Sequence, residues 1–190
     1  AVVPQTYEYG VNPDGSQWTK VFAGPDGAQS LAWEKTTTDV LGRAIKTERP
    51  GAQGAVQATL RLYDALGRLS RVQMSGAPDS IYEYDALGNQ TRAGQDVDGD
   101  GQLNPESMDV VSDAHNAFEK VDGDWWSSSI ALAYPDDNSG RPFKTSVNRR
   151  RLTGLGGGQP VLVSETVAID ALGQQAVHRA YVDRAGKTAR

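Results

Sequence analysis

The sequence predicts an all-β protein built from successive β-hairpins in a repeat array. Three observations support this fold class: one turn motif recurs, alternating apolar and polar residues flank it, and turn formers are abundant, with 21 Gly and 9 Pro among 190 residues. The motif is Asp-x-x-Gly, and its recurrence makes a repeat architecture the first hypothesis. Its six copies are Asp39–Gly42, Asp64–Gly67, Asp85–Gly88, Asp137–Gly140, Asp170–Gly173 and Asp183–Gly186.

Asp-x-x-Gly has the chemistry of a type I β-turn that continues into a G1 bulge. The Asp side chain can accept a hydrogen bond from the backbone two residues further on. Gly at the fourth position adopts positive φ without a steric penalty. Because this combination closes short hairpin loops, we expect each copy to be the tip of a hairpin.

Alternating residues precede the best copies of the motif. In residues 56–62, before Asp64, apolar residues occupy one parity and polar residues the other. Residues 161–169, before Asp170, alternate similarly apart from one acidic residue. A period of two bounded by turn residues is typical of β-strands. We therefore expect strands between the corners and one hairpin-repeat region over residues 1–190.

Weaker turn signals extend this pattern. Segments 12–15 and 24–27 each end in Pro-Asp-Gly, and Val121–Asp124 carries Asp-Gly between two expected strands. For residues 106–118, which precede the Val121–Asp124 turn, a helix is the competing interpretation. Adjacent β-branched residues at 110–111 and the lack of a clear helix cap favour strands there.

The best copies also carry flanking residues of a known repeat. Tyr63-Asp64-Ala65-Leu66-Gly67-Arg68-Leu69 resembles, at every position, the Tyr-Asp-x-x-Gly-Arg-Leu unit of the YD-repeat or Rhs (rearrangement hot spot) family, and segment 84–89 lacks only the Arg. The resemblance covers most of the chain apart from residues 95–133. It implies hairpins wound into a spiral sheet that forms a hollow shell, as in bacterial polymorphic toxins, insecticidal toxin complexes and teneurins. The self-cleaving Asp-Pro-x-Gly segment that ends Rhs toxin cores is not found in the sequence.

Composition restricts the classes of function. The hydrophobic share of 38% is below that of a typical packed domain and suits a sheet with a wet face. A net charge of −5 opposes nucleic-acid binding, and the basic cluster Arg149–Arg151 is best interpreted as an exposed strand end.

The chain has no Cys, no apolar run of the roughly 18 residues that span a bilayer, and no signal-peptide pattern at its start. Because segment 183–190 ends just after a turn, we expect the chain to be a piece of a longer repeat protein.

One segment, inserted at residues 95–109, has the ligand spacing of a calcium loop. Acidic residues recur at positions one, three and five, Gly101 at position six permits a sharp bend, and position eight is the apolar Leu103. Hard oxygen donors at this spacing suit Ca²⁺, as in the loops of EF-hands and dockerins, which the segment resembles. The candidate ligands are Asp96, Asp98, Asp100, Gln102, Asn104 and Ser107.

Position twelve of this loop departs from the pattern. It holds Ser107, where a bidentate carboxylate is expected. Glu106 or Asp109 can substitute, and the affinity is then expected to be weak. We predict that Ca²⁺ has a structural role and fixes the insertion to the sheet.

Catalytic motifs are absent from the sequence. His115 and His178 are the two histidines, and neither accompanies a nucleophile motif or a metal-binding His pair. Adjacent Trp125 and Trp126 point to opposite faces of a strand, so at most one of them is expected to form a ligand-binding surface. We therefore expect no catalytic residues.

These observations predict a non-enzymatic scaffold that is secreted or on the cell surface, and the resemblance to bacterial toxins of the YD/Rhs family implies a bacterial source. Its expected partners are further repeats of a longer parent chain or copies of itself, and it could enclose a passenger polypeptide or a glycan. Neither nucleic acid nor a membrane span is expected. The alternative is a carbohydrate- or receptor-binding adhesion module that uses an exposed Trp.

Overall fold

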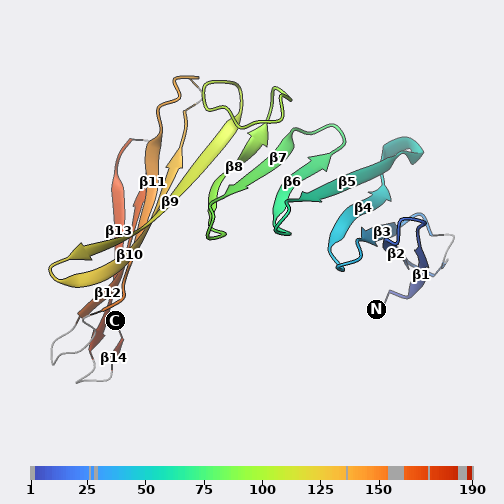
Figure 1. Cartoon of the computed structure of the whole chain (residues 1–190). Helices are drawn as coiled ribbons and strands as arrows, with labels where there is room; N and C mark the ends of the chain where they lie inside the picture. The colour runs from blue at the N-terminus through green and yellow to red at the C-terminus, as the bar shows by residue number, and fades with distance from the viewer. Residues whose placement is uncertain are drawn as a thin grey trace. The chain divides into compact units, whose positions relative to one another are not determined.

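The chain is an all-β protein, as the sequence predicts. The computed structural model describes residues 3–25, 27, 30–135, 137–153, 161–170, 172–183 and 188–189 (Figure 1). The strands are β1 Gln5–Val11, β2 Gln17–Ala23, β3 Trp33–Thr38, β4 Ala44–Pro50, β5 Val56–Tyr63, β6 Leu69–Met74, β7 Asp79–Tyr84, β8 Gln90–Asp96, β9 Val110–Val121, β10 Asp124–Ala133, β11 Phe143–Arg151, β12 Val161–Ile169, β13 Gln175–Asp183 and β14 Thr188–Ala189.

The strands form one sheet in which spatial order follows sequence order. Neighbours are hydrogen-bonded from β1 through to β14, and the pairings with a determined register are antiparallel, as in β1–β2 and β9–β10. This order confirms a succession of hairpins. The described helical structure includes the 3-10 turn Ala52–Gly54 but no α-helix. No helix in the described ranges is long and apolar enough to cross a membrane.

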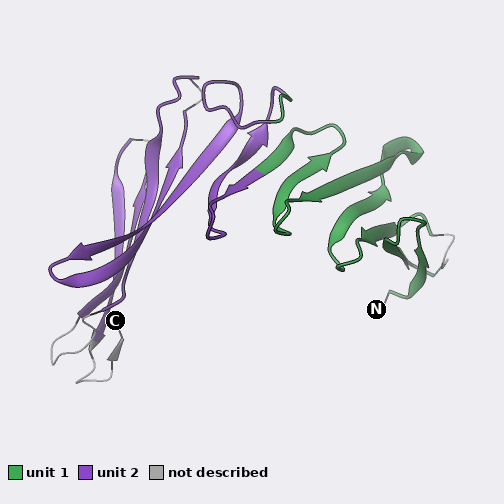
Figure 2. Cartoon of the chain, in the orientation of Figure 1, with its two compact units in different colours: residues 1–81, 99–101 green, residues 82–98, 102–190 purple. Residues whose placement is uncertain are grey.

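The chain divides into two compact units, coloured in Figure 2: residues 1–81 with 99–101, and residues 82–98 with 102–190. Each has a thin apolar core. Phe22 and Ile81 are the buried apolar side chains described in the first unit, and Leu103 and Val111 those in the second. Few of the described side chains are therefore withdrawn from water in either unit.

Alternation in the sequence predicts strands correctly but does not predict burial. The apolar parity of β5 includes Val56, Leu60 and Leu62, and all three side chains are exposed. Antiparallel sheets can leave a face in water. In β5, even the alternate positions that carry apolar side chains are therefore largely exposed to water.

Four corners share the predicted turn geometry, and the corner at Asp64 is representative. The Gly67 N–H donates to the Asp64 carbonyl oxygen at 2.9 Å, and the Asp64 N–H donates to the Arg68 carbonyl oxygen at 2.8 Å. The Asp64 Oδ1 atom accepts the Leu66 and Arg68 N–H groups, each at 2.9 Å. Gly67 has a φ of +80°. The same bonds recur at Asp39, Asp85 and Asp170.

The residue after the Gly completes the corner. Arg68 Nε donates to the second carboxylate oxygen of Asp64 at 2.7 Å, and Arg43 makes the same bond to Asp39. Where Asn89 replaces Arg, its side-chain amide makes the bond at 2.9 Å. This contact gives a physical reason for Arg at the fifth position of the corner.

A Tyr joins successive corners within the first unit. The Tyr63 hydroxyl donates to the Ala44 carbonyl oxygen at 2.9 Å, and the Arg43 guanidinium lies 4.5 Å from the centre of the Tyr63 ring. Tyr63 thus packs on the arginine that closes the preceding corner. At this corner the Tyr and the preceding Arg of the pattern thus connect two neighbouring hairpins.

One of the six predicted corners differs from these four, and another lies mostly outside the described residues. At Asp137–Gly140 the described backbone lacks a hydrogen bond from the Gly140 N–H to the Asp137 carbonyl oxygen. Asn138 has a φ of +52°, and the Ser139 N–H donates to the Asp137 carboxylate. Pro135 and Pro142 flank this segment, and a proline contributes no N–H to a ladder, so β10 and β11 are joined by a long loop. The corner Asp183–Gly186 lies mostly outside the described residues, as does Asp26 in the predicted turn at 24–27.

Gly88→Ala tests the geometry of the corner. Gly88 has a φ of +89°, and a Cβ placed there would meet nothing within 4 Å, so backbone strain alone determines the effect. We expect a loss of about 1 kcal/mol in the free energy of unfolding, measured by urea denaturation. Leu87→Ala, at an exposed site in the same turn, is the control and should change stability by less than about 0.5 kcal/mol. Equal effects of the two substitutions would contradict the assigned turn.

Candidate metal centre

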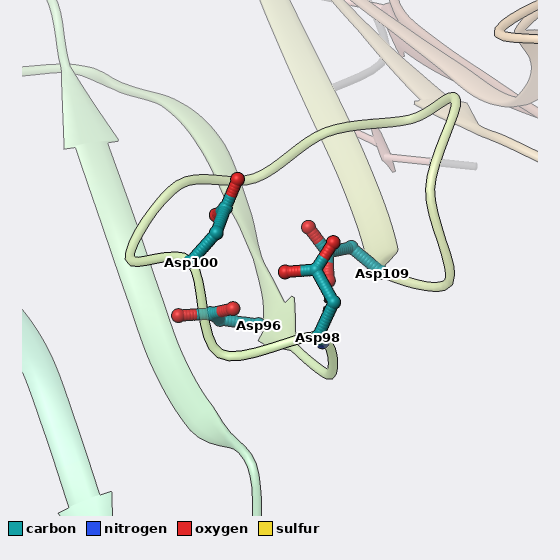
Figure 3. A group of neighbouring side chains, drawn as sticks. All are labelled: Asp96, Asp98, Asp100 and Asp109. Carbon is teal, nitrogen blue, oxygen red and sulfur yellow. Dashed lines mark hydrogen bonds between the residues drawn. The ribbon is translucent and has the colours of Figure 1, made fainter.

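The loop between β8 and β9 gathers four carboxylates. Asp96 ends β8 and is 4% exposed, and Asp98, Asp100 and Asp109 follow in the same loop (Figure 3). One carboxylate oxygen from each of the four residues lies within 4.8 Å of the others. Three members of this cluster are predicted ligands, and the fourth is one of the two predicted substitutes for position twelve.

Asp109 organises the loop through the backbone. Its Oδ1 accepts the Val97 N–H at 2.7 Å, and its Oδ2 accepts the Asn104 N–H at 2.9 Å. Burial opposes ionisation of this carboxyl group, but bonds from the backbone of Asn104, Val97 and Asp98 and from Ser107 outweigh it and lower its pKa below the ordinary value of 3.8. Asp109 is therefore charged at neutral pH.

The alternatives at position twelve have different surroundings. The Ser107 hydroxyl donates to the Asn104 carbonyl oxygen at 2.9 Å and accepts the Asp109 N–H at 3.2 Å, so it supports the loop. Glu106 lies against Gly140, where an added Cβ would be 2.7 Å from the Glu106 Cγ. Among the described residues, Asp109 is thus the substitute that joins the acidic cluster.

Three anchors hold the loop. Leu103, at position eight, is 3% exposed and lies against Gly94 of β8, where an added Cβ would be 3.0 Å from Leu103. Arg92 Nη1 donates to the Leu103 carbonyl oxygen at 3.4 Å. Arg71 Nη2 donates to the Gly101 carbonyl oxygen at 2.7 Å. The bend at position six has the positive φ expected of Gly101, +88°.

The donor set suits a hard divalent cation. Four carboxylates within one loop repel one another, and an ion between them would offset that repulsion. Ca²⁺ accepts six to eight oxygen ligands in flexible geometry, so carboxylates, backbone carbonyl groups and water can share its coordination sphere. Of the other two predicted ligands, Asn104 contributes its N–H to the loop network, and Gln102 lies between the anchored residues Gly101 and Leu103.

A partly buried ionic network lies beside the loop anchor Arg92. Arg92 Nε and Nη2 donate to the two carboxylate oxygens of Asp113 at 2.7 and 3.0 Å, and the Tyr134 hydroxyl donates to Asp113 at 2.6 Å. The Arg92 bond lowers the pKa of Asp113 against the opposing effect of burial. Burial and the Asp113 bond raise the pKa of Tyr134. The sequence gives no local signal for this network, because its members lie on three separate segments.

The second predicted surface involves β10. Trp125 is 46% exposed, whereas Trp126 is half-buried and has the Arg151 guanidinium 5.8 Å from its ring centre. Phe118 is exposed on β9. The register pairs Trp125 with Lys120 and Phe118 with Ser127, so Trp125 and Phe118 are on one face of the sheet.

The remaining sequence candidates occupy ordinary strand positions. His115 is in β9 and His178 in β13. Within the basic cluster, Arg149 pairs with Glu119 and Arg151 with Asp124. Two of the three arginines are therefore engaged in ion pairs.

A scan against protein-family models and a search of curated proteins each gave no match to this chain. The resemblance to YD/Rhs repeats therefore depends on the repeat residues themselves, chiefly Tyr63–Leu69 and Tyr84–Asn89.

Proposed function

We propose that this chain is a non-enzymatic structural scaffold, a YD/Rhs-like β-repeat segment that forms part of a wall or shell. One observation carries the proposal: the strands pair in sequence order along one sheet, and few apolar side chains are buried among the described residues. A sheet of this kind offers an extended surface and edges for assembly. The contact of Tyr63 with the preceding corner adds support, since it joins one hairpin to the next.

The edges of the sheet are the proposed sites of assembly. An edge strand presents unpaired backbone groups that can bind another strand. In the proposal, these edges pair with further repeats of a longer chain or with other copies, in a secreted or cell-surface setting. A shell made in this way could enclose a passenger polypeptide.

Sedimentation velocity of the purified chain tests the scaffold. We expect a mass above 20.4 kDa that rises with concentration. A species that stays at 20.4 kDa at every concentration, or that turns over a substrate, would overturn the proposal.

Calcium is the proposed stabiliser of the insertion. The support is the convergence of Asp96, Asp98, Asp100 and Asp109 in a loop already held at Leu103 and Gly101. In the proposal, bound Ca²⁺ fixes the loop to the sheet and contributes to stability by mass action, about 2.7 kcal/mol at a hundredfold excess over Kd.

Asp98→Asn is expected to weaken Ca²⁺ binding at least about tenfold, because it removes one anionic ligand from the cluster. Isothermal titration calorimetry measures the affinity, and one ion per chain is expected for the original sequence. Asp122→Asn is the matched control: it makes the same change at the tip of the β9–β10 hairpin, where Asp122 has a φ of +51° that Asn tolerates. Absence of binding at millimolar calcium, or equal affinities of the two variants, would exclude the site.

A second candidate function is an adhesion module. It is favoured by the exposed pair Trp125 and Phe118, since aromatic rings stack on sugars and dominate protein interfaces. In this case the chain would bind a glycan array as a monomer, and Trp125→Ala would abolish binding. Trp126→Ala is the control, because Trp126 is half-buried beside Arg151.

A further inference from the structure

One face of the sheet in strands β9 to β13 is more exposed than the other. Residues that pair across an antiparallel sheet point to the same face. The central row of the exposed face takes one residue from each of four neighbouring strands: Phe118, Ser127, Arg150 and Ser164. The buried residues described in these strands are Val111, Asp113 and Ser128, and all three lie on the opposite face, because successive residues of a strand alternate. We name the exposed side the Phe118 face, and its strands all belong to the second unit.

The two faces of these strands differ in charge. On the opposite face, ion pairs join Glu119 to Arg149, Asp124 to Arg151 and Glu165 to Arg179. The Phe118 face carries Lys120 and Arg150, and both are exposed. Neither cation has an ion-pair partner among the described residues, and the described strand positions of this face include no Asp or Glu. In a chain of net charge −5, this face is therefore a positive surface that suits an anionic ligand.

Aromatic rings and short polar side chains accompany the two cations. Trp125 lies opposite Lys120 in the register, and Phe118 is 71% exposed. The row beside the central one consists of Asn116, Ser129, Asn148, Thr166 and His178. Aromatic faces are suited to stack on sugar rings, and amide and hydroxyl side chains can pair with sugar hydroxyl groups. This combination favours a glycan over an acidic polypeptide, which has no hydroxyl-bearing rings.

We infer that the Phe118 face binds an acidic polysaccharide, one that contains uronate sugars. This inference rests on the adhesion function, the second candidate above, and names its class of ligand. Arg150 presents a planar guanidinium fork that matches a carboxylate group, and Lys120 adds a second cation beside Trp125. Neighbouring strands are about 4.8 Å apart, so the backbones at Phe118 in β9 and Arg150 in β11 are separated by about 10 Å. One extended oligosaccharide can therefore contact both side chains.

Arg150→Gln tests the inference by calorimetric titration with a hyaluronan oligosaccharide, in which every second sugar is a uronate. We expect the original chain to bind this probe about tenfold more tightly than the same oligosaccharide with methyl-esterified carboxylates, because a charged hydrogen bond is lost in the ester. Arg150→Gln should remove this preference. Arg149→Gln is the matched control: it makes the same change one residue away on the opposite face, where Arg149 pairs with Glu119, and should keep the preference.

The possible failures of this inference and of the adhesion function are distinct. Equal binding of the acid and its ester, with loss of both in Trp125→Ala, would overturn the acidic ligand and leave the adhesion function standing. Equal losses in Arg150→Gln and Arg149→Gln would overturn the assignment to the Phe118 face. Tighter binding of polyglutamate than of the oligosaccharide would overturn the choice of a glycan. Absence of binding to any glycan would overturn both the adhesion function and this inference.

Discussion

Leu103→Ala is expected to lower the free energy of unfolding by about 3 kcal/mol, the usual cost of a large-to-small change at a buried site. Leu103 is among the few buried apolar side chains described in its unit, and it packs on Gly94 of β8. Neighbouring strands cannot easily collapse into the space that it leaves. Urea denaturation followed by the fluorescence of Trp125 and Trp126, which lie in the same unit, measures the change.

The same substitution should also weaken Ca²⁺ binding, because Leu103 fixes the loop that presents the carboxylates. Leu87→Ala removes an equal number of atoms at an exposed position and is the control for both measurements. A loss of less than about 1 kcal/mol for Leu103→Ala would show that the insertion is not anchored through this residue.

Asp113→Asn is expected to cost about 2–3 kcal/mol, because it leaves the Arg92 guanidinium partly buried without its counter-charge. Asp113 accepts both Arg92 bonds and the Tyr134 hydroxyl. Asn has nearly the same shape, so the loss reports on charge and hydrogen bonding and not on a cavity. Thermal and urea denaturation at neutral pH measure it, with Asp122→Asn as the control at an exposed hairpin tip.

The stability contributed by this network is expected to depend on pH. The pKa of Asp113 is lowered in the folded chain by Arg92, against burial, and the unfolded carboxyl group titrates near its ordinary value of 3.8. Its contribution to stability is thus fully present above that value and is lost as the pH falls through the lower folded pKa. Asp113→Asn should flatten the decline in stability below about pH 4. An acid decline identical to that of the original chain would contradict this assignment.

The part of the fold that sequence predicts well is encoded locally. An Asp, a Gly with positive φ and the following residue form a closed set of bonds within five residues, as at Asp64. Strand periodicity is also local. Together they predict the order of hairpins, because each strand pairs with the next along the chain.

What the sequence does not predict depends on contacts between distant segments. The apolar parity of β5 is exposed because burial depends on what covers a face, which periodicity does not specify. The corner at Asp137 differs because neighbouring prolines lengthen its loop. In the network of Arg92, Asp113 and Tyr134, Asp113 is 21 residues from each of its two partners in the sequence. No sequence motif indicates these contacts.

The candidate metal loop lies between these extremes. Its spacing identifies Asp96, Asp98 and Asp100 directly. The choice between Glu106 and Asp109 depends on loop geometry: Glu106 packs against Gly140, whereas Asp109 lies with the other carboxylates. The sequence therefore predicts three of the four clustered carboxylates, and the structure adds Asp109 to the cluster.

Recurring Asp-x-x-Gly corners fold this chain into successive hairpins, and through-hydrogen-bond scalar couplings in NMR can detect the bonds of each corner. We expect a coupling from the Gly67 N–H to the Asp64 carbonyl and another from the Asp64 N–H to the Arg68 carbonyl. The same two couplings are expected at the corners of Asp39, Asp85 and Asp170. Couplings between each N–H and the carbonyl four residues before it, as in a helix, or no couplings at these corners, would contradict this arrangement.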